Sequence, residues 1–84
     1  MANETTAGGA RTVVDARGSS CPGPITDLAL AYRRASKGDV IELWGTDAGM
    51  PPDVRAWADK TRNEVVSIET QPDKIVAVVR ILNR

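Results

Sequence analysis

The chain has no histidine and a single cysteine, Cys21, among its 84 residues. Without histidine it cannot contain a Cys–His or Ser–His–Asp catalytic site or a histidine-ligated metal site. With one cysteine it cannot form an intramolecular disulfide or a C-x-x-C redox pair. Chemistry at Cys21 therefore uses one thiol alone or with the sulfur of another molecule. We expect neither a metal nor a cofactor.

Net charge and aromatic residues are also in short supply. Eleven basic and eleven acidic residues cancel, and the aromatic residues are two tryptophans and one tyrosine, with no phenylalanine. A dedicated nucleic-acid binder has an excess of basic residues and aromatic side chains for stacking on bases. The composition therefore argues against direct nucleic-acid binding.

The sequence contains no segment suited to a membrane. Its longest apolar run, from Ile75 to Val79, is far shorter than the ~20 residues that a spanning helix needs. The first ten residues lack the basic and apolar regions of a signal peptide. A lone thiol without an export signal indicates the reducing cytoplasm, where we expect the protein to act.

Apolar residues at helical spacing predict two helices. The first follows Pro22 and ends before Gly38, which fits a left-handed cap. Its apolar face comprises Ile25, Leu28, Ala29 and Tyr32. The second opens at 51–53 and ends near Asn63, which is expected to cap it in the left-handed conformation. Its apolar face comprises Val54, Trp57, Ala58 and Thr61.

Four strands are expected at residues 12–15, 40–44, 64–70 and 74–82, with Val66 and Ile68 on one side of the third. The last two form a hairpin through the turn at 71–74. Right-handed crossovers then give an α+β fold, a two-layer α/β sandwich of order β-α-β-α-β-β. It has a four-stranded mixed sheet with two helices on one face. We expect residues 1–10 to be a flexible tail and residues 11–84 to form the domain.

The last strand is apolar on both sides, which leaves two interpretations of the open sheet face. In the first, which we favour, it is a central strand with a partly exposed apolar back. In the second, the open face binds a partner and Trp44 takes part.

The sequence Cys21-Pro22-Gly23-Pro24 stands where a turn leads into the first helix. A helix N-terminus carries partial positive charge and favours the thiolate, which is the nucleophilic form. Because proline lacks an N–H, the donors of the first turn are Gly23 and Ile25. A thiol without a base or a resolving cysteine suits sulfur transfer. From spacing alone, a small buried cysteine beside a capping motif fits equally well.

The stretch from Asp15 to Pro24 resembles the signature of the TusA (SirA-like) sulfur-carrier family, and the likeness extends over residues 13–84. The resemblance implies that Cys21 accepts sulfur as a persulfide and hands it on. The turn beneath it would be shaped by Asp15, Arg17 and Gly18. Two further aspartates, Asp47 and Asp53, either contact partners or cap the second helix.

Three features depart from the family pattern. Ser19 stands where the family usually has leucine, and Gly23 occupies a variable position that is acidic in some relatives. The loop over residues 50–52 is also unusual. We expect these departures to influence the choice of partner.

The leading hypothesis is therefore a monomeric sulfurtransferase that works as a persulfide carrier. The resemblance implies a donor of the cysteine-desulfurase or rhodanese type and an acceptor of the DsrE-like or thiolation-enzyme type. The relay would serve tRNA thiolation, cofactor synthesis or sulfur oxidation. The alternative is a non-catalytic interaction or regulatory module of the same fold. RNA binding has only the analogy to a translation initiation factor domain in its favour.

Overall fold

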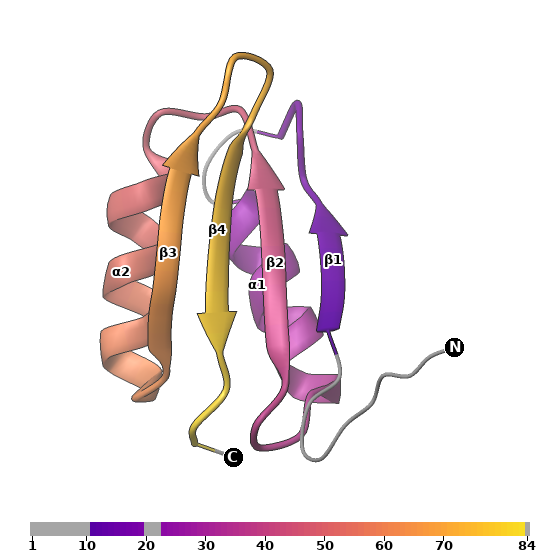
Figure 1. Cartoon of the computed structure of the whole chain (residues 1–84), viewed down its shortest axis with the longest axis vertical. Helices are drawn as coiled ribbons and strands as arrows, with labels where there is room; N and C mark the ends of the chain where they lie inside the picture. The colour runs from indigo at the N-terminus through magenta and orange to yellow at the C-terminus, as the bar shows by residue number, and fades with distance from the viewer. Residues whose placement is uncertain (1–10, 20–22, 84) are drawn as a thin grey trace.

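The helices and strands follow one another in the predicted order. A computed structural model describes residues 11–19 and 23–83. The elements are β1 (Arg11–Asp15), α1 (Gly23–Arg34), β2 (Val40–Gly45), α2 (Met50–Thr61), β3 (Glu64–Thr70) and β4 (Ile75–Arg80) (Figure 1). Residues 1–10 lie outside the described ranges, so the division into tail and domain stays a prediction.

The strands form one four-stranded sheet in the order β1-β2-β4-β3. β1 and β2 run parallel, whereas β4 is antiparallel to both of its neighbours, β2 and β3. Both helices lie behind the sheet in the view of Figure 1. The predicted α+β sandwich with a mixed sheet and both helices on one face is confirmed. β4, whose residues are mostly apolar, lies inside the sheet between β2 and β3.

The core fills the space between the two helices and the sheet. Its largest fully buried side chains include Leu28 of α1, Met50 and Val54 of α2, and Ile41 and Leu43 of β2. Each helix thus buries the stripe that its apolar spacing predicts. Within the described ranges, neither helix is long and apolar enough to cross a membrane.

The helices also contact each other through their aromatic residues. The rings of Tyr32 and Trp57 meet edge to face, with centroids 5.3 Å apart and an interplanar angle of 88°. Such T-shaped pairs are favourable because the positive edge of one ring meets the negative face of the other. The pair fixes α1 against α2.

The prediction that Val66 and Ile68 lie on the same side of β3 was wrong. The pairing with β4 slips between Val65 and Ser67, which marks a β-bulge. Val65 and Ile68 consequently pack against the core, while Val66 is 46% exposed. A bulge adds one residue and so reverses the alternation that a regular strand would keep.

The predicted helix ends also need correction. α1 ends at Arg34, and Gly38 adopts a left-handed φ of 96° in the turn that follows rather than at the helix end itself. α2 ends with Arg62, not Asn63, in the left-handed conformation (φ 62°). The Asn63 side chain is used differently, because its Oδ1 accepts the backbone N–H groups of Leu82 and Asn83 at 2.9 and 3.1 Å.

The open face of the sheet is covered by side chains of the strands themselves. The outward-facing Val76 is only 8% exposed. Ion pairs join Arg11 to Glu42 at 2.7 Å and Arg80 to Glu64 at 3.2 Å on this face. The face therefore combines ion pairs with partly exposed apolar side chains, among them Val13 at 50% and Val66 at 46% exposed.

Candidate functional site

The carboxyl ends of the two parallel strands bring the predicted site residues to one end of the molecule. The turn after β1, the loop from β2 into α2 and the β3–β4 hairpin meet there, at the top of Figure 1. α1 begins at the same end, at Gly23. Cys21 and Pro22 lie outside the described residues, so the site is built from the residues on either side of them.

A tight turn over residues 16–19 leads from β1 towards Cys21. Ser19 donates its backbone N–H to the Ala16 carbonyl at 3.2 Å, and Gly18 has a φ of 87°, which favours glycine. Ala16 is 2% exposed and donates its N–H to the Trp44 carbonyl at 2.8 Å. The turn is thus anchored to β2 at its first residue.

Hydrogen bonds between Asp15 and Arg17 stabilise this turn. The backbone N–H of Arg17 donates to Asp15 Oδ1 at 3.1 Å. The guanidinium of Arg17 donates to both carboxylate oxygens, at 2.9 and 2.8 Å. The side-chain and backbone donors of Arg17 hold the pKa of Asp15 below its usual value. The structure therefore brings the predicted residues Asp15, Arg17 and Gly18 together in one turn.

Thr46, which the sequence analysis did not single out, also holds the turn. The N–H of Gly18 donates to Thr46 Oγ1 at 3.0 Å. Thr46 follows β2 directly, and the parallel register pairs Asp15 with Trp44. A sequence signal therefore existed: if two parallel strands end together, the residues just beyond them are neighbours.

The sequence analysis considered Trp44 only as a residue of the open face, yet its side chain contacts three charged side chains. The guanidinium carbon of Arg17 lies 5.2 Å from its ring centroid, and the ammonium of Lys74 lies 4.8 Å from it. Its Nε1–H donates to Glu42 at 2.6 Å. This hydrogen bond, followed by that from Arg11, lowers the pKa of Glu42. Trp44 thus ties the turn to β2 and the hairpin.

The turn and the start of α1 lie close together. A Cβ placed on Gly23 would lie 3.0 Å from the Cβ of Ser19. Two of the three departures from the family pattern, Ser19 and Gly23, are therefore neighbours in space, and the small residue at position 23 makes room for Ser19. Pro24 is fully buried and Ile25 packs against the core, so both anchor the first turn of the helix.

The two aspartates beyond β2 lie at the start of α2. Asp47 Oδ1 accepts the N–H of Gly49 at 3.1 Å, and the Asp47 carbonyl accepts the N–H of Met50 at 2.9 Å. Asp53 stands in the first turn of α2, where its charge complements the helix dipole. The N-cap residue of α2 is Gly49 and no side chain caps it, so Asp47 holds the turn that precedes the helix.

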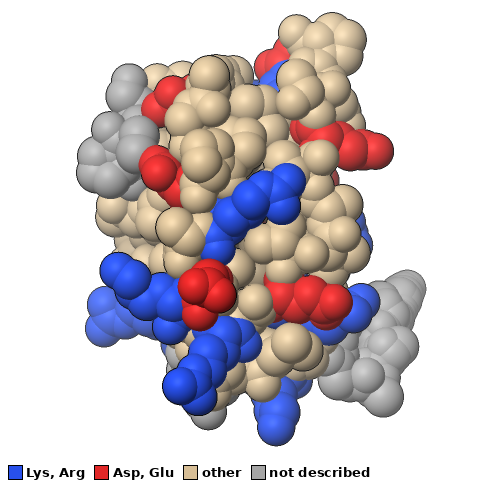
Figure 2. Space-filling model, turned by 90° about the vertical axis from the view of Figure 1, so that its left-hand side faces the viewer, with Lys and Arg blue, Asp and Glu red and all other residues tan. Residues whose placement is uncertain are grey.

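Charge is unevenly distributed although the net charge is zero. Both helices finish with basic residues at the end away from the site: Arg33 and Arg34 in α1, Lys60 and Arg62 at the end of α2. Most of the Lys and Arg atoms visible in Figure 2 accordingly lie in its lower half. The first turn of α1, from Gly23 onwards, has no acidic side chain. The helix start next to Cys21 therefore keeps the positive end of its dipole.

A family model described as sulfurtransferase TusA matches residues 12–81. The chain belongs to the TusA sulfurtransferase family, which confirms the resemblance and supports a role in carrying sulfur.

Relatives of this chain bear the provisional name of sulfur carrier protein. One from Archaeoglobus fulgidus is 34% identical over 70 residues, which is 83% of this chain and 96% of that protein. YrkF of Bacillus subtilis is 36% identical over 62 residues, or 74% of this chain but only 34% of YrkF. One from Halobacterium salinarum is 32% identical over 68 residues, covering 80% of this chain and 84% of that protein.

Proposed function

We propose that the protein is a sulfur carrier that accepts sulfane sulfur as a persulfide on Cys21 and passes it to a protein acceptor. The observation that carries the proposal is the closeness of Ser19 to Gly23, where an added Cβ would lie 3.0 Å from the Cβ of Ser19. These residues stand two positions on either side of Cys21. In the sequence, the thiol thus stands between two residues that lie close together, directly before the start of α1.

The proposed chemistry needs one thiolate and no net oxidation. The Cys21 thiolate attacks the outer sulfur of a donor persulfide, R–S–SH. A new S–S bond forms to give Cys21–S–SH, the S–S bond of the donor breaks, and R–S⁻ leaves with the electron pair. An acceptor thiolate then attacks the outer sulfur of Cys21–S–SH. It takes away the SH group and restores the Cys21 thiolate.

The neighbouring residues support this chemistry by fixing the loop. Pro22 and Pro24 limit the backbone, and Gly23 and Ile25 supply the N–H donors of the first helical turn towards the thiolate. On the other side, Asp15, Arg17 and Gly18 hold the turn. Asp47 and Asp53 keep the start of α2 in place beside the surface on which partners dock.

Partners of two kinds follow from this reaction. A cysteine desulfurase or a rhodanese-type protein supplies the sulfur, and a DsrE-like protein or a thiolation enzyme consumes it. We propose that the carrier acts as a monomer in the cytoplasm, where a thiol stays reduced. The relay serves tRNA thiolation, cofactor synthesis or sulfur oxidation.

The test is the intact mass of the reduced protein after incubation with polysulfide. We expect wild type to gain the mass of one sulfur atom and to lose it again on treatment with dithiothreitol. Cys21→Ser removes the thiol and must gain nothing, while Ser19→Ala, a matched change in the same loop, keeps the uptake. Equal uptake by wild type and Cys21→Ser, or no uptake by wild type, would refute the proposal.

A further inference from the structure

The sheet has an unpaired edge at β1. This strand ends the strand order and has β2 as a neighbour on one side (Figure 1). Ala16 donates its backbone N–H to the Trp44 carbonyl of β2. Because the backbone groups of successive residues face the two sides of a strand alternately, Thr12 and Val14 also face β2. The N–H and C=O of Val13 face outwards, and they have no strand partner in the described part of the chain.

The opposite edge of the sheet, at β3, is less suited to pairing. A β-bulge in its pairing with β4 interrupts the regular spacing, and bulges protect an edge from further strands. β1 has an unbroken register and contains no proline. Its charged residues already have partners, because Arg11 pairs with Glu42 and Asp15 with Arg17. β1 is therefore the better edge for pairing with a further strand.

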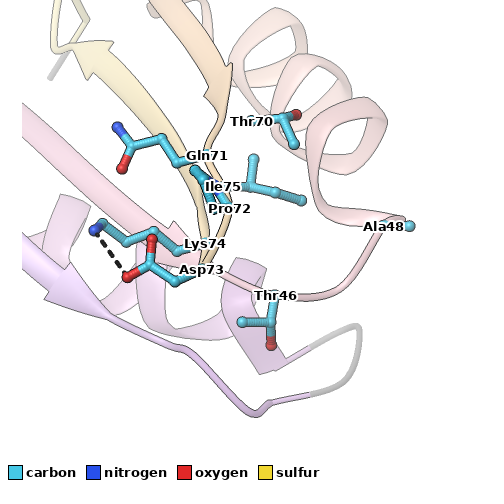
Figure 3. A pocket seen from close by; sticks show the side chains of 8 residues that line it. All are labelled: Thr46, Ala48, Thr70, Gln71, Pro72, Asp73, Lys74 and Ile75. Carbon is cyan, nitrogen blue, oxygen red and sulfur yellow. Dashed lines mark ion pairs between the residues drawn. The ribbon is translucent and has the colours of Figure 1, made fainter.

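A groove of about 490 Å³ lies beside this edge, between β1 and the second half of α1. Leu30 of α1 presents an aliphatic side chain to the groove and is 53% exposed. The hollow beside the β3–β4 hairpin is smaller, about 250 Å³, and is bordered by the ion pair of Lys74 and Asp73 (Figure 3). The lining of the groove is mostly uncharged and comprises Thr12, Val14, Leu30, Ala31, Arg34, Ala35 and Asp39.

The two charged residues of the groove favour an acidic group in its occupant. Asp39 Oδ2 accepts the backbone N–H of Ser36 at 2.8 Å, so this carboxylate is engaged within its own turn. Arg34, the last residue of α1, takes part in none of the ion pairs between described residues. An acidic side chain beside Arg34 would therefore gain a charge-assisted hydrogen bond. One helical turn earlier, Leu30 offers aliphatic surface instead.

We infer that β1 and this groove bind an extended segment of a partner protein, which adds a strand antiparallel to β1. The central residue of the segment exchanges two backbone hydrogen bonds with Val13. The residue before it is aliphatic and packs against Val14 and Leu30, and the residue after it is acidic and meets Arg34. In strand addition, main-chain bonds supply affinity and side-chain pockets supply specificity. The groove borders the end of α1, whereas Cys21 precedes its start, so the inference does not depend on sulfur transfer.

The probe is the blocked peptide acetyl-Thr-Lys-Leu-Val-Glu-Thr-amide, titrated into the 15N-labelled full chain up to about 1 mM. Its valine is placed to pair with Val13, with the leucine and the glutamate on either side. The control peptide exchanges the leucine and the glutamate, so it keeps the composition and the backbone. We expect NMR shifts at the amides of Val13 and Leu30, slower hydrogen exchange at the Val13 N–H, and binding of the control about tenfold weaker or less.

Variants of the groove test the side-chain contacts. Leu30→Lys places a charge among apolar groups and should weaken binding about tenfold. Leu82→Lys is the matched control, because Leu82 is 47% exposed and lies outside the groove, and it should leave binding unchanged. Arg34→Glu should reverse the preference, so that it binds a peptide with lysine in place of the glutamate more tightly than wild type does.

Absence of binding to wild type, equal affinity for the probe and the control peptide, or equal effects of the two lysine variants would overturn the inference. Two other occupants would overturn it as well. One is the chain's own start, revealed by nuclear Overhauser contacts between the Leu30 methyl groups and residues 1–10. The other is a second copy, revealed by a dimer in sedimentation that Val13→Pro abolishes, since proline removes the outward N–H.

Discussion

The close approach of Gly23 to Ser19 gives the sharpest prediction about the thiol loop. In Gly23→Ala, the new Cβ would lie 3.0 Å from the Cβ of Ser19. Carbon atoms prefer separations of ~3.5–4.0 Å. Neither Cβ can rotate away, because each is bonded directly to the backbone. The turn or the first residue of α1 must therefore move.

The expected cost follows from two opposing effects. Overpacking of this kind costs about 1–3 kcal/mol. Replacing glycine by alanine inside a helix stabilises the helix by up to about 1 kcal/mol, and by less at the first position of the helix. We therefore expect Gly23→Ala to lower the free energy of unfolding by about 1–2 kcal/mol. Because Cys21 is two residues away, the rate at which its thiol reacts with a chromogenic disulfide should change as well.

Urea unfolding followed by tryptophan fluorescence measures the effect on stability. Ser19→Gly removes the opposing Cβ, so a double-mutant cycle should show a favourable coupling of about 1 kcal/mol or more between the two changes. Gly49→Ala is the control, because its Cβ would meet Asp47 Oδ1 at an ordinary 3.7 Å. Wild-type stability of Gly23→Ala, or zero coupling with Ser19→Gly, would contradict the packing described here.

Further predictions concern the open face and the C-terminal end. The lowered pKa of Glu42 means that its contacts stabilise the fold above the unfolded pKa of ~4.3 and are lost as pH falls through the folded value. Urea midpoints over acidic pH should therefore fall more steeply for wild type than for Glu42→Gln. Trp44→Phe removes the indole donor, so NMR titration should show a higher pKa for Glu42. Asn63→Ala removes the acceptor of the Leu82 and Asn83 N–H groups and should cost about 1 kcal/mol, with faster hydrogen exchange at both amides, whereas Asn63→Asp keeps both protected.

The order of the elements was predictable because helical and strand periodicity are local properties. Leu28 and Val54 are buried as their spacing indicates. Which side chains of β3 point to the core was not predictable. The bulge arises from the pairing of β3 with β4, and it leaves Val66 outside the core. Asn63 has the stronger intrinsic preference for the left-handed cap. Its side chain instead accepts the backbone N–H of Leu82, and Arg62 occupies the left-handed cap position of α2.

The candidate site was predictable only where its contacts are local. Asp15 and Arg17 are two residues apart, and their interaction follows from the turn they share. The contacts of Thr46 with Gly18 and of Trp44 with Lys74 join positions about thirty residues apart. Such contacts depend on the register of the sheet. The one between Thr46 and Gly18 could be anticipated only on the assumption that the two parallel strands end together, and spacing alone does not establish that.

The central claim is that Cys21 both accepts and releases one sulfur atom. The most direct measurement loads the protein with isotopically labelled polysulfide, removes the excess and then adds a reduced DsrE-like acceptor protein. Fragment masses are followed at Cys21 and at the acceptor. We predict one labelled sulfur on Cys21 that disappears as the same label is found on an acceptor cysteine. Label that stays on Cys21, or that reaches the acceptor equally well with Cys21→Ser, would contradict the account.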